Sequence, residues 1–304
     1  MESVWNQRIA MYESHLQLEK MMAHNSILAY LRDVKKLQSF AENQLEVLSP
    51  ESITLTDLQE FLYQQFKEKT SPRAQARWIS GIKSFFHFLV EENLIPTSPA
   101  LLLQAPKLGF YLPDTLSTTE IDSLLLQIER GSFIGERDYC ILEVLYGCGL
   151  RVSEAIELKI SSINFKENFV EVMGKGDKVR WVPLTDYTQE IIENYIKYYR
   201  SEIDIHPDFT DTLFLNARGK ALSRVSVFTM IKALAVKAHL KKNISPHTFR
   251  HSYATHLLQN GADLRFIQEM LGHSSITTTE IYTHLETEEL RATVLHHHPR
   301  NQNI

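Results

Sequence analysis

This sequence of 304 residues has few cysteines, no long apolar run and no pattern of a secretory signal in its first residues. Its two cysteines, Cys140 and Cys148, lie in an apolar stretch, and their spacing fits neither a metal site nor a redox motif. No apolar run reaches the ~20 residues of a membrane-spanning helix, and the first residues carry an early acid without an apolar core. We therefore expect a cytoplasmic protein with buried reduced thiols, no secretory signal and no membrane insertion.

Acidic residues are missing from one long tract, residues 212–262. The net charge of the chain is −5, which by itself argues against a nucleic-acid partner, but net charge says little when charges are segregated. The acid-free tract carries eight basic residues: Arg218, Lys220, Arg224, Lys232, Lys237, Lys241, Lys242 and Arg250. We expect this tract to face a polyanion. A second basic run covers residues 67–83, and for it a solvated helix face is the alternative.

The pattern of apolar residues and prolines predicts two domains. Residues 1–105 have helical periodicity and predict a small helical bundle, in which Thr56 and Gln59 form a capping box and Ser71-Pro72 begins a later helix. Closely spaced prolines predict a linker at 106–116.

Residues 117–304 form the second predicted domain, and a capping box of Ser117 and Glu120 opens it. Apolar and polar residues alternate over 168–184 on both sides of a Gly-Lys-Gly-Asp turn, which predicts a β-hairpin. The fold class is therefore mainly α with a small β-hairpin or sheet: an N-terminal helical bundle and a C-terminal α+β domain.

A cationic pair marks the start of a predicted helix in the acid-free tract. Pro246 stands at the first helical position after a Ser245 cap, and His247 and Arg250 then share one helical face. A guanidinium donates paired hydrogen bonds to phosphate oxygens, and an imidazole moves a proton near neutral pH. The pattern favours a phosphate site, and a polar first turn that faces water is the alternative.

Metal binding is the other interpretation of these histidines. His247 and His251 are four residues apart, but no carboxylate lies near them in the sequence and the tract is positive, so we expect no metal. We expect His251 and His256 to have structural roles. The histidines at 296–298 lie near the chain end, and we expect them to be solvated.

Two further polar signals lie upstream. Arg151 and Glu154 are one helical turn apart, after glycines at positions 147 and 149 that allow a close approach of backbone to a ligand. Lys175 lies at the tip of the predicted hairpin. Each has an ordinary alternative, a surface ion pair and a solvated turn lysine.

The order of these residues resembles the tyrosine recombinases, the phage-integrase-type family of site-specific DNA recombinases. The family combines an Arg in a G-L-R-x-x-E context, a hairpin Lys, an H-x-x-R pair, an L-G-H element and a nucleophilic Tyr about nine residues later. This sequence has GLRVSE at 149–154, Lys175, HTFR at 247–250, LGH ending at His273, and IYTH with Tyr282. The N-terminal part resembles the family's SAM-like core-binding domain, and within the family the chain is most similar to the Xer recombinases that resolve chromosome dimers.

The resemblance implies that duplex DNA is cut and rejoined through a 3′-phosphotyrosyl intermediate on Tyr282, without metal, cofactor or ATP. Arg151, Arg250 and His273 would hold the charge of the transition state. Lys175 would protonate the leaving 5′-oxygen, His247 would act as general base or proton carrier, and Glu154 would orient Arg151.

The implied partners are double-stranded DNA, other protomers in a tetramer on paired sites, a second related recombinase, and a DNA-translocase activator. The alternatives are a mobile-element integrase, a type IB topoisomerase-like enzyme, and a non-catalytic DNA-binding regulator of the same fold. The expected DNA contacts are Lys67, Lys69, Arg73, Arg77, Lys83, Arg218, Arg224, Lys241 and Lys242.

The segment after Tyr282 has two interpretations. It turns acidic at residues 286–289, and Leu285, Leu290 and Val294 predict an apolar stripe. In the resembled family such a segment docks into a neighbouring protomer. The alternative is a last helix packed on its own domain.

Overall fold

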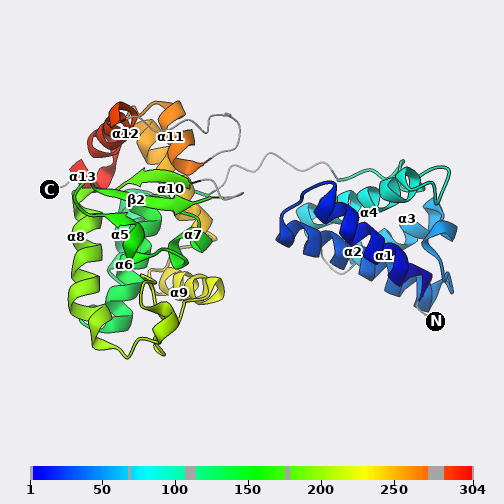
Figure 1. Cartoon of the computed structure of the whole chain (residues 1–304), viewed down its shortest axis with the longest axis horizontal. Helices are drawn as coiled ribbons and strands as arrows, with labels where there is room; N and C mark the ends of the chain where they lie inside the picture. The colour runs from blue at the N-terminus through cyan, green and yellow to red at the C-terminus, as the bar shows by residue number, and fades with distance from the viewer. Residues whose placement is uncertain (1–2, 68–69, 107–113, 175–178, 273–283, 303–304) are drawn as a thin grey trace. The chain divides into compact units, whose positions relative to one another are not determined.

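The computed structural model describes residues 3–67, 70–106, 114–174, 179–272 and 284–302, with the backbone alone at 284–288 and 302. The chain divides into two compact units, Met1–Tyr111 and Leu112–Ile304 (Figure 1). It is mainly helical with one small sheet, so the predicted fold class is confirmed. Within the described residues no helix is both long and apolar enough to cross a membrane. Of the predicted linker, residues 107–113 lie outside this description.

The first unit is a bundle built from α1 (Val4–Leu18), α2 (His24–Gln44), α3 (Leu55–Lys67) and α4 (Pro72–Glu91). Helix α4 begins as predicted, because the Ser71 hydroxyl accepts a hydrogen bond from the Ala74 amide. Helix α1, which was not predicted, packs against α2 and α4 and buries Trp5 and Tyr12 completely. The aromatic side chains of α4 complete this core.

The predicted cap of α3 was wrong by two residues. The helix begins at Leu55, and the capping pair is Thr54 with Asp57. The Thr54 hydroxyl accepts from the Asp57 amide at 3.3 Å, and an Asp57 oxygen accepts from the Thr54 amide at 2.8 Å. The same spacing occurs at Thr56 and Gln59, but the carboxylate is the stronger acceptor for a free amide.

The second unit surrounds the buried helix α6 with further helices and a sheet. Its elements are α5 (Thr118–Leu125), α6 (Phe133–Gly147), α7 (Val152–Ile156), β1 (Ile163–Asn164), β2 (Phe169–Met173), β3 (Val179–Pro183), α8 (Asp186–Asn194), α9 (Arg224–Lys237), α10 (Pro246–Gln259), α11 (Leu264–Leu271), α12 (His284–His297) and α13 (Pro299–Gln302). The predicted Ser117–Glu120 capping box is present at α5. The predicted hairpin is β2 paired antiparallel with β3, and β1 adds a third strand beside β2.

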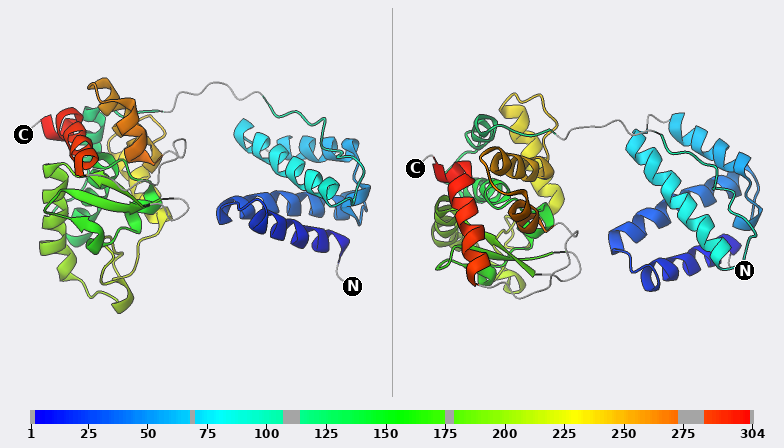
Figure 2. Two further views of the ribbon diagram at one scale, coloured as in Figure 1. Left: turned by 45° about the horizontal axis from the view of Figure 1, so that its top comes forward. Right: turned by 90° about the horizontal axis from the view of Figure 1, so that it is seen from above.

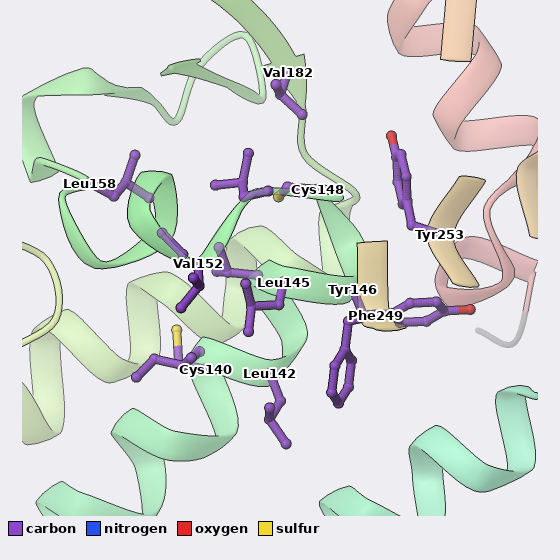
Figure 3. Packing of buried hydrophobic residues seen from close by; sticks show 14 of the residues in the cluster. Cys140, Leu142, Leu145, Tyr146, Cys148, Val152, Leu158, Val182, Phe249 and Tyr253 are labelled. Carbon is purple, nitrogen blue, oxygen red and sulfur yellow. The ribbon is translucent and has the colours of Figure 1, made fainter. Parts of the chain in front are cut away.

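Helix α10 packs directly on α6, and this contact sets the position of the cationic pair. Figure 3 shows Phe249 and Tyr253 of α10 among side chains of α6 and the loop after it, including Tyr146. Cys140 and Cys148 are buried and unpaired in the same core, as predicted. Burial raises the pKa of both thiols.

The C-terminal segment packs on its own unit, which is the second of the two interpretations given for it. Helix α12 lies against α10, α11 and β3, and α13 lies against α8 (Figure 2). Leu290 and Val294 are buried, as the apolar stripe predicted, whereas the side chain of Leu285 lies outside the described residues.

The expected solvation of the terminal histidines was wrong for His298. Its side chain is completely buried, with the rings of Tyr146 and Tyr253 centred 4.8 and 5.4 Å away. Burial lowers its pKa to about 3, so the imidazole is neutral. Nearness to the chain end misled the prediction, because the enclosing rings come from α6 and α10.

Candidate active site

Arg151 lies at the start of α7, and residues of α10 contact the loop that precedes it. Gly149 has a φ of +59°, and a Cβ on it would fall 2.5 Å from the Tyr253 ring. Its carbonyl accepts a hydrogen bond of 2.8 Å from Nη1 of Arg250. The close backbone approach at Gly149 is therefore made to Tyr253, whereas that at Gly147 is made to Thr188, and the Gly149 carbonyl links the Arg151 loop to Arg250.

Glu154 is the centre of the site, and its carboxylate is shared by three guanidiniums. Arg151 donates to Oε1 at 2.7 Å through Nη1, and its backbone amide donates to Oε2 at 2.8 Å. Arg180 donates to both oxygens, at 3.0 and 2.8 Å, and Arg250 Nη1 lies 3.9 Å from Oε2. The Glu154 side chain is 6% exposed, so the surface ion pair offered as an alternative is excluded.

The three guanidiniums around one carboxylate change the pKa values of the groups in the site. Burial alone would raise the pKa of Glu154, but the hydrogen bonds and positive charge of Arg180, with those of Arg151, hold that pKa below its usual range. Burial, followed by the charge of Arg151, lowers the pKa of Arg250 to about 10. Arg250 therefore still carries its charge at neutral pH. One carboxylate faces three cations, which leaves the site positive and suited to an anion.

The end of α11 fixes the same three guanidiniums a second time. The last carbonyls of a helix have no partner inside the helix and carry its negative dipole end. The bonds join Arg180 Nε to the Met270 carbonyl at 2.8 Å, Arg250 Nη2 to the Leu271 carbonyl, and Arg151 Nη2 to the Gly272 carbonyl at 3.4 Å. Each of three consecutive carbonyls thus accepts from a different arginine. Sequence reasoning predicted two of these arginines and missed Arg180.

His247 lies in the first turn of α10, one turn before Arg250, and it is exposed. His251 is exposed as well, so its expected structural role stays a prediction, and partial burial followed by the charge of His247 lowers its pKa. His256 is buried, and its Nδ1 lies 2.8 Å from the Tyr146 hydroxyl, which confirms its structural role.

Lys175, His273 and Tyr282 lie outside the described residues. Their neighbours in the chain are described. Lys175 follows β2 by two residues, His273 follows the Gly272 carbonyl that binds Arg151, and Tyr282 precedes α12 by two residues.

The basic residues expected to contact DNA differ in exposure and in partners. Arg218, Arg224, Lys241 and Lys242 are exposed, and Lys67 and Arg73 are exposed in the first unit. Some of the expected residues have contacts within the chain: Lys67 with the Tyr63 ring, Arg77 with buried Asp33, Lys83 with the Leu101 carbonyl, and Lys242 with Glu120 and the Thr115 carbonyl. Lys69 lies outside the described residues.

Two features of the first unit were not predicted. A groove of about 500 Å³ along α2 is lined by Arg32, Lys35 and Lys36, whose helical spacing was visible in the sequence. Among the described side chains, His15, Glu19 and Glu92 form a group that could hold a metal ion, with ligand atoms within 4.8 Å of one another. None of these three belongs to the predicted catalytic set.

Comparison with known proteins places this site in a family. Residues 114–289 match the phage integrase family, and residues 9–93 match the phage integrase N-terminal SAM-like domain. The chain is 42% identical over 289 residues to the tyrosine recombinase XerD of Staphylococcus saprophyticus, covering 95% of this chain and 97% of that protein. Its identity to XerD of Staphylococcus aureus is 43%, with the same coverage.

Solved structures share the fold at lower identity. The Tn1549 transposon integrase in complex with circular intermediate DNA matches with a TM-score of 0.72 and 21% identity, covering 92% of this chain and 97% of that one. The XerH recombinase bound to its difH substrate matches with a TM-score of 0.67 and 22% identity, covering 98% and 83%.

The chain belongs to the phage integrase family of tyrosine recombinases. It is a site-specific recombinase, an enzyme of DNA strand breakage and rejoining.

Proposed function

We propose that this recombinase cuts and rejoins duplex DNA by transferring a phosphodiester to Tyr282, with Arg151 and Arg250 holding the phosphate. The observation that carries the proposal is the double anchoring of these two guanidiniums, to the buried carboxylate of Glu154 and to the end of α11. The next residue after that helix end is His273, and Tyr282 follows nine residues later. An anchored, net positive site needs little reorganisation when charge develops on a phosphate.

In the proposed first step, the Tyr282 hydroxyl oxygen attacks phosphorus and its proton passes to His247. The bond from phosphorus to the 5′-oxygen breaks, and that oxygen takes a proton from Lys175. Arg151, Arg250 and His273 stabilise the extra negative charge between these events. The second step reverses the first with a different 5′-hydroxyl as nucleophile, so the phosphotyrosyl bond stores the energy and no ATP is consumed.

We propose chromosomal DNA as the substrate and resolution of chromosome dimers as the role. The support is 42–43% identity to XerD recombinases over nearly the full length. The cell compartment would then be the cytoplasm, where bacterial chromosomes lie. The reaction needs four active sites on two duplexes, hence a tetramer, and a second related recombinase and a DNA translocase are the partners that this role would involve.

Covalent trapping tests the chemistry. The protein-bound DNA is first sequenced from the cells that make the protein, and a duplex carrying that site with a nick near the scissile phosphate then serves as substrate. Wild-type protein should remain joined to DNA on denaturing gels, and Tyr282→Phe should bind the same DNA without joining it. Tyr198→Phe is the matched control, because that side chain is exposed on the helical turn Tyr195–Tyr199 and belongs to no predicted site. A covalent complex in the Tyr282 variant would mean that another residue is the nucleophile.

The same sequencing tests the role. A single chromosomal site near the replication terminus fits dimer resolution. Sites at the ends of a mobile element would show instead that the protein is an integrase with the same chemistry.

A further inference from the structure

Arg180 is a buried arginine that contacts both Glu154 and the end of α11. It lies on β3, and its side chain is 6% exposed. All three guanidinium nitrogens donate: Nε to the Met270 carbonyl at 2.8 Å, Nη1 to Glu154 at 3.0 Å and Nη2 to Glu154 at 2.8 Å. Each guanidinium nitrogen thus has a partner within the protein, and because the side chain is enclosed we expect Arg180 not to contact DNA itself.

Its position is electrostatically costly. Arg180 shares the inner face of β3 with Val182, which is completely buried. Burying a guanidinium costs several kcal/mol unless it is well paired, and its one carboxylate is shared with Arg151 and Arg250. An apolar side chain would suit a strand face of this kind better. The arginine therefore needs a reason other than stability.

The contacts supply that reason, because Arg180 joins three segments that carry predicted catalytic residues. Its strand leads back to Lys175, five residues earlier. Its guanidinium holds Glu154, which binds Arg151. Its side chain also supports the end of α11, since a Cβ on Gly272 would lie 3.1 Å from Arg180 Cδ, and Gly272 directly precedes His273.

We propose that Arg180 is a positioning residue of the strand-transfer reaction, which holds Glu154 and the end of α11 so that Arg151 and Arg250 keep their donors toward the phosphate. The proposal rests on the function proposed above. Without Arg180, Glu154 would neutralise Arg151 and Arg250 more fully, and the Met270 carbonyl would lose its partner.

The first test measures single-turnover covalent joining of purified full-length protein to the nicked duplex. Arg180→Gln should slow joining by about 10–100-fold, the usual effect of losing a group that orients a reacting residue, while the Kd for DNA stays within about threefold. Arg180→Lys should lie between, because one ammonium cannot replace three fixed donors. Arg200→Gln is the matched control: Arg200 is also a buried arginine, but it donates only to the carbonyls of residues 209, 210 and 212.

The second test separates positioning from a general structural role. A methylphosphonate at the scissile position removes the negative charge of the phosphate, so the reaction needs less help from Arg151 and Arg250. The defect of Arg180→Gln should then shrink to less than about fivefold. A defect of equal size on both substrates, or one matched by Arg200→Gln, would overturn the proposal.

The third test follows the route through Glu154. If Arg180 acts through this carboxylate, Glu154→Gln with Arg180→Gln should join DNA about as fast as Glu154→Gln alone. If the fold-losses of the two single variants instead multiply in the double variant, the result would contradict the proposal. Failure of the wild-type protein to join DNA would count against the proposed function, whereas wild-type joining with an unaffected Arg180→Gln would count against this inference alone.

Discussion

Replacing Arg300 by methionine should destabilise the catalytic unit through one buried carboxylate. Arg300 Nε donates to Glu143 at 3.0 Å, and Nη1 donates to Asp122 at 2.7 Å. The Glu143 side chain is completely buried, whereas that of Asp122 is 48% exposed. The Asp122 contact should therefore contribute little, since exposed ion pairs are screened by water. The Glu143 contact should dominate, because the variant leaves a buried charge without its partner.

The expected magnitude follows from that difference in burial. Breaking a buried ion pair from one side costs about 3–5 kcal/mol, which for a unit of this size corresponds to a fall in Tm of roughly 6–20 °C. The loss should depend on pH. Burial raises the pKa of Glu143 from its ordinary 4.5, and Arg300 partly offsets this effect. Without Arg300 that pKa rises further.

The sign of the pH dependence follows from the raised pKa of the carboxyl group. Below pH 4.5 the carboxyl is protonated in the folded and unfolded chain, so the folded state carries no penalty for its charge. As pH rises above 4.5 the unfolded chain loses this proton first, so the penalty grows until the pH passes the folded pKa, above which it is complete. The deficit of Arg300→Met should be complete at pH 8 and shrink toward pH 5.

Thermal unfolding of the full-length chain between pH 5 and pH 8 measures this effect. Lys232→Met is the control, because Lys232 is an exposed cation on α9 and should change Tm little. Glu143→Met with Arg300→Met should recover most of the lost stability, since this pair then leaves no unpartnered buried charge. A deficit that is independent of pH, or a double variant no more stable than Arg300→Met, would refute the reasoning.

Two further expectations concern DNA binding and chemistry. Each phosphate contact contributes about −0.9 to the slope of log K against log salt. If the exposed basic residues of the acid-free tract contact phosphates, the affinity for DNA should fall more than about tenfold when salt rises from 50 to 200 mM. An affinity that hardly changes would mean that the tract does not face DNA. Covalent joining should persist in EDTA, because the predicted set consists of cations, imidazoles and a tyrosine, and both oxygens of Glu154 already accept from arginines; a strict magnesium requirement for cleavage would remove the proposed mechanism.

The sequence alone determined the parts of this protein that depend on short-range spacing. Ser117 and Glu120 form their capping box, the alternating pattern forms the β2–β3 hairpin, and Arg151 lies against Glu154. In each case the partners are a few residues apart, and the geometry of one turn or one strand pair brings them together. The order of the family motifs also indicated the class of enzyme, because that order is read along the chain and does not depend on knowing the fold.

The tertiary structure decided which polar groups are buried and which of them share a partner. Arg180 meets Met270 across 90 residues, and Arg300 meets Glu143 across 157. The sequence gives one hint, since Arg180 falls at a position of its strand where the alternating pattern places buried side chains. That pattern does not identify the residues of other segments that pack against this position. His298 shows the same limit: its position near the chain end predicted solvent, and two tyrosines of other helices enclose it. Burial is a property of packed surfaces, and the residues that form those surfaces are far apart in the chain.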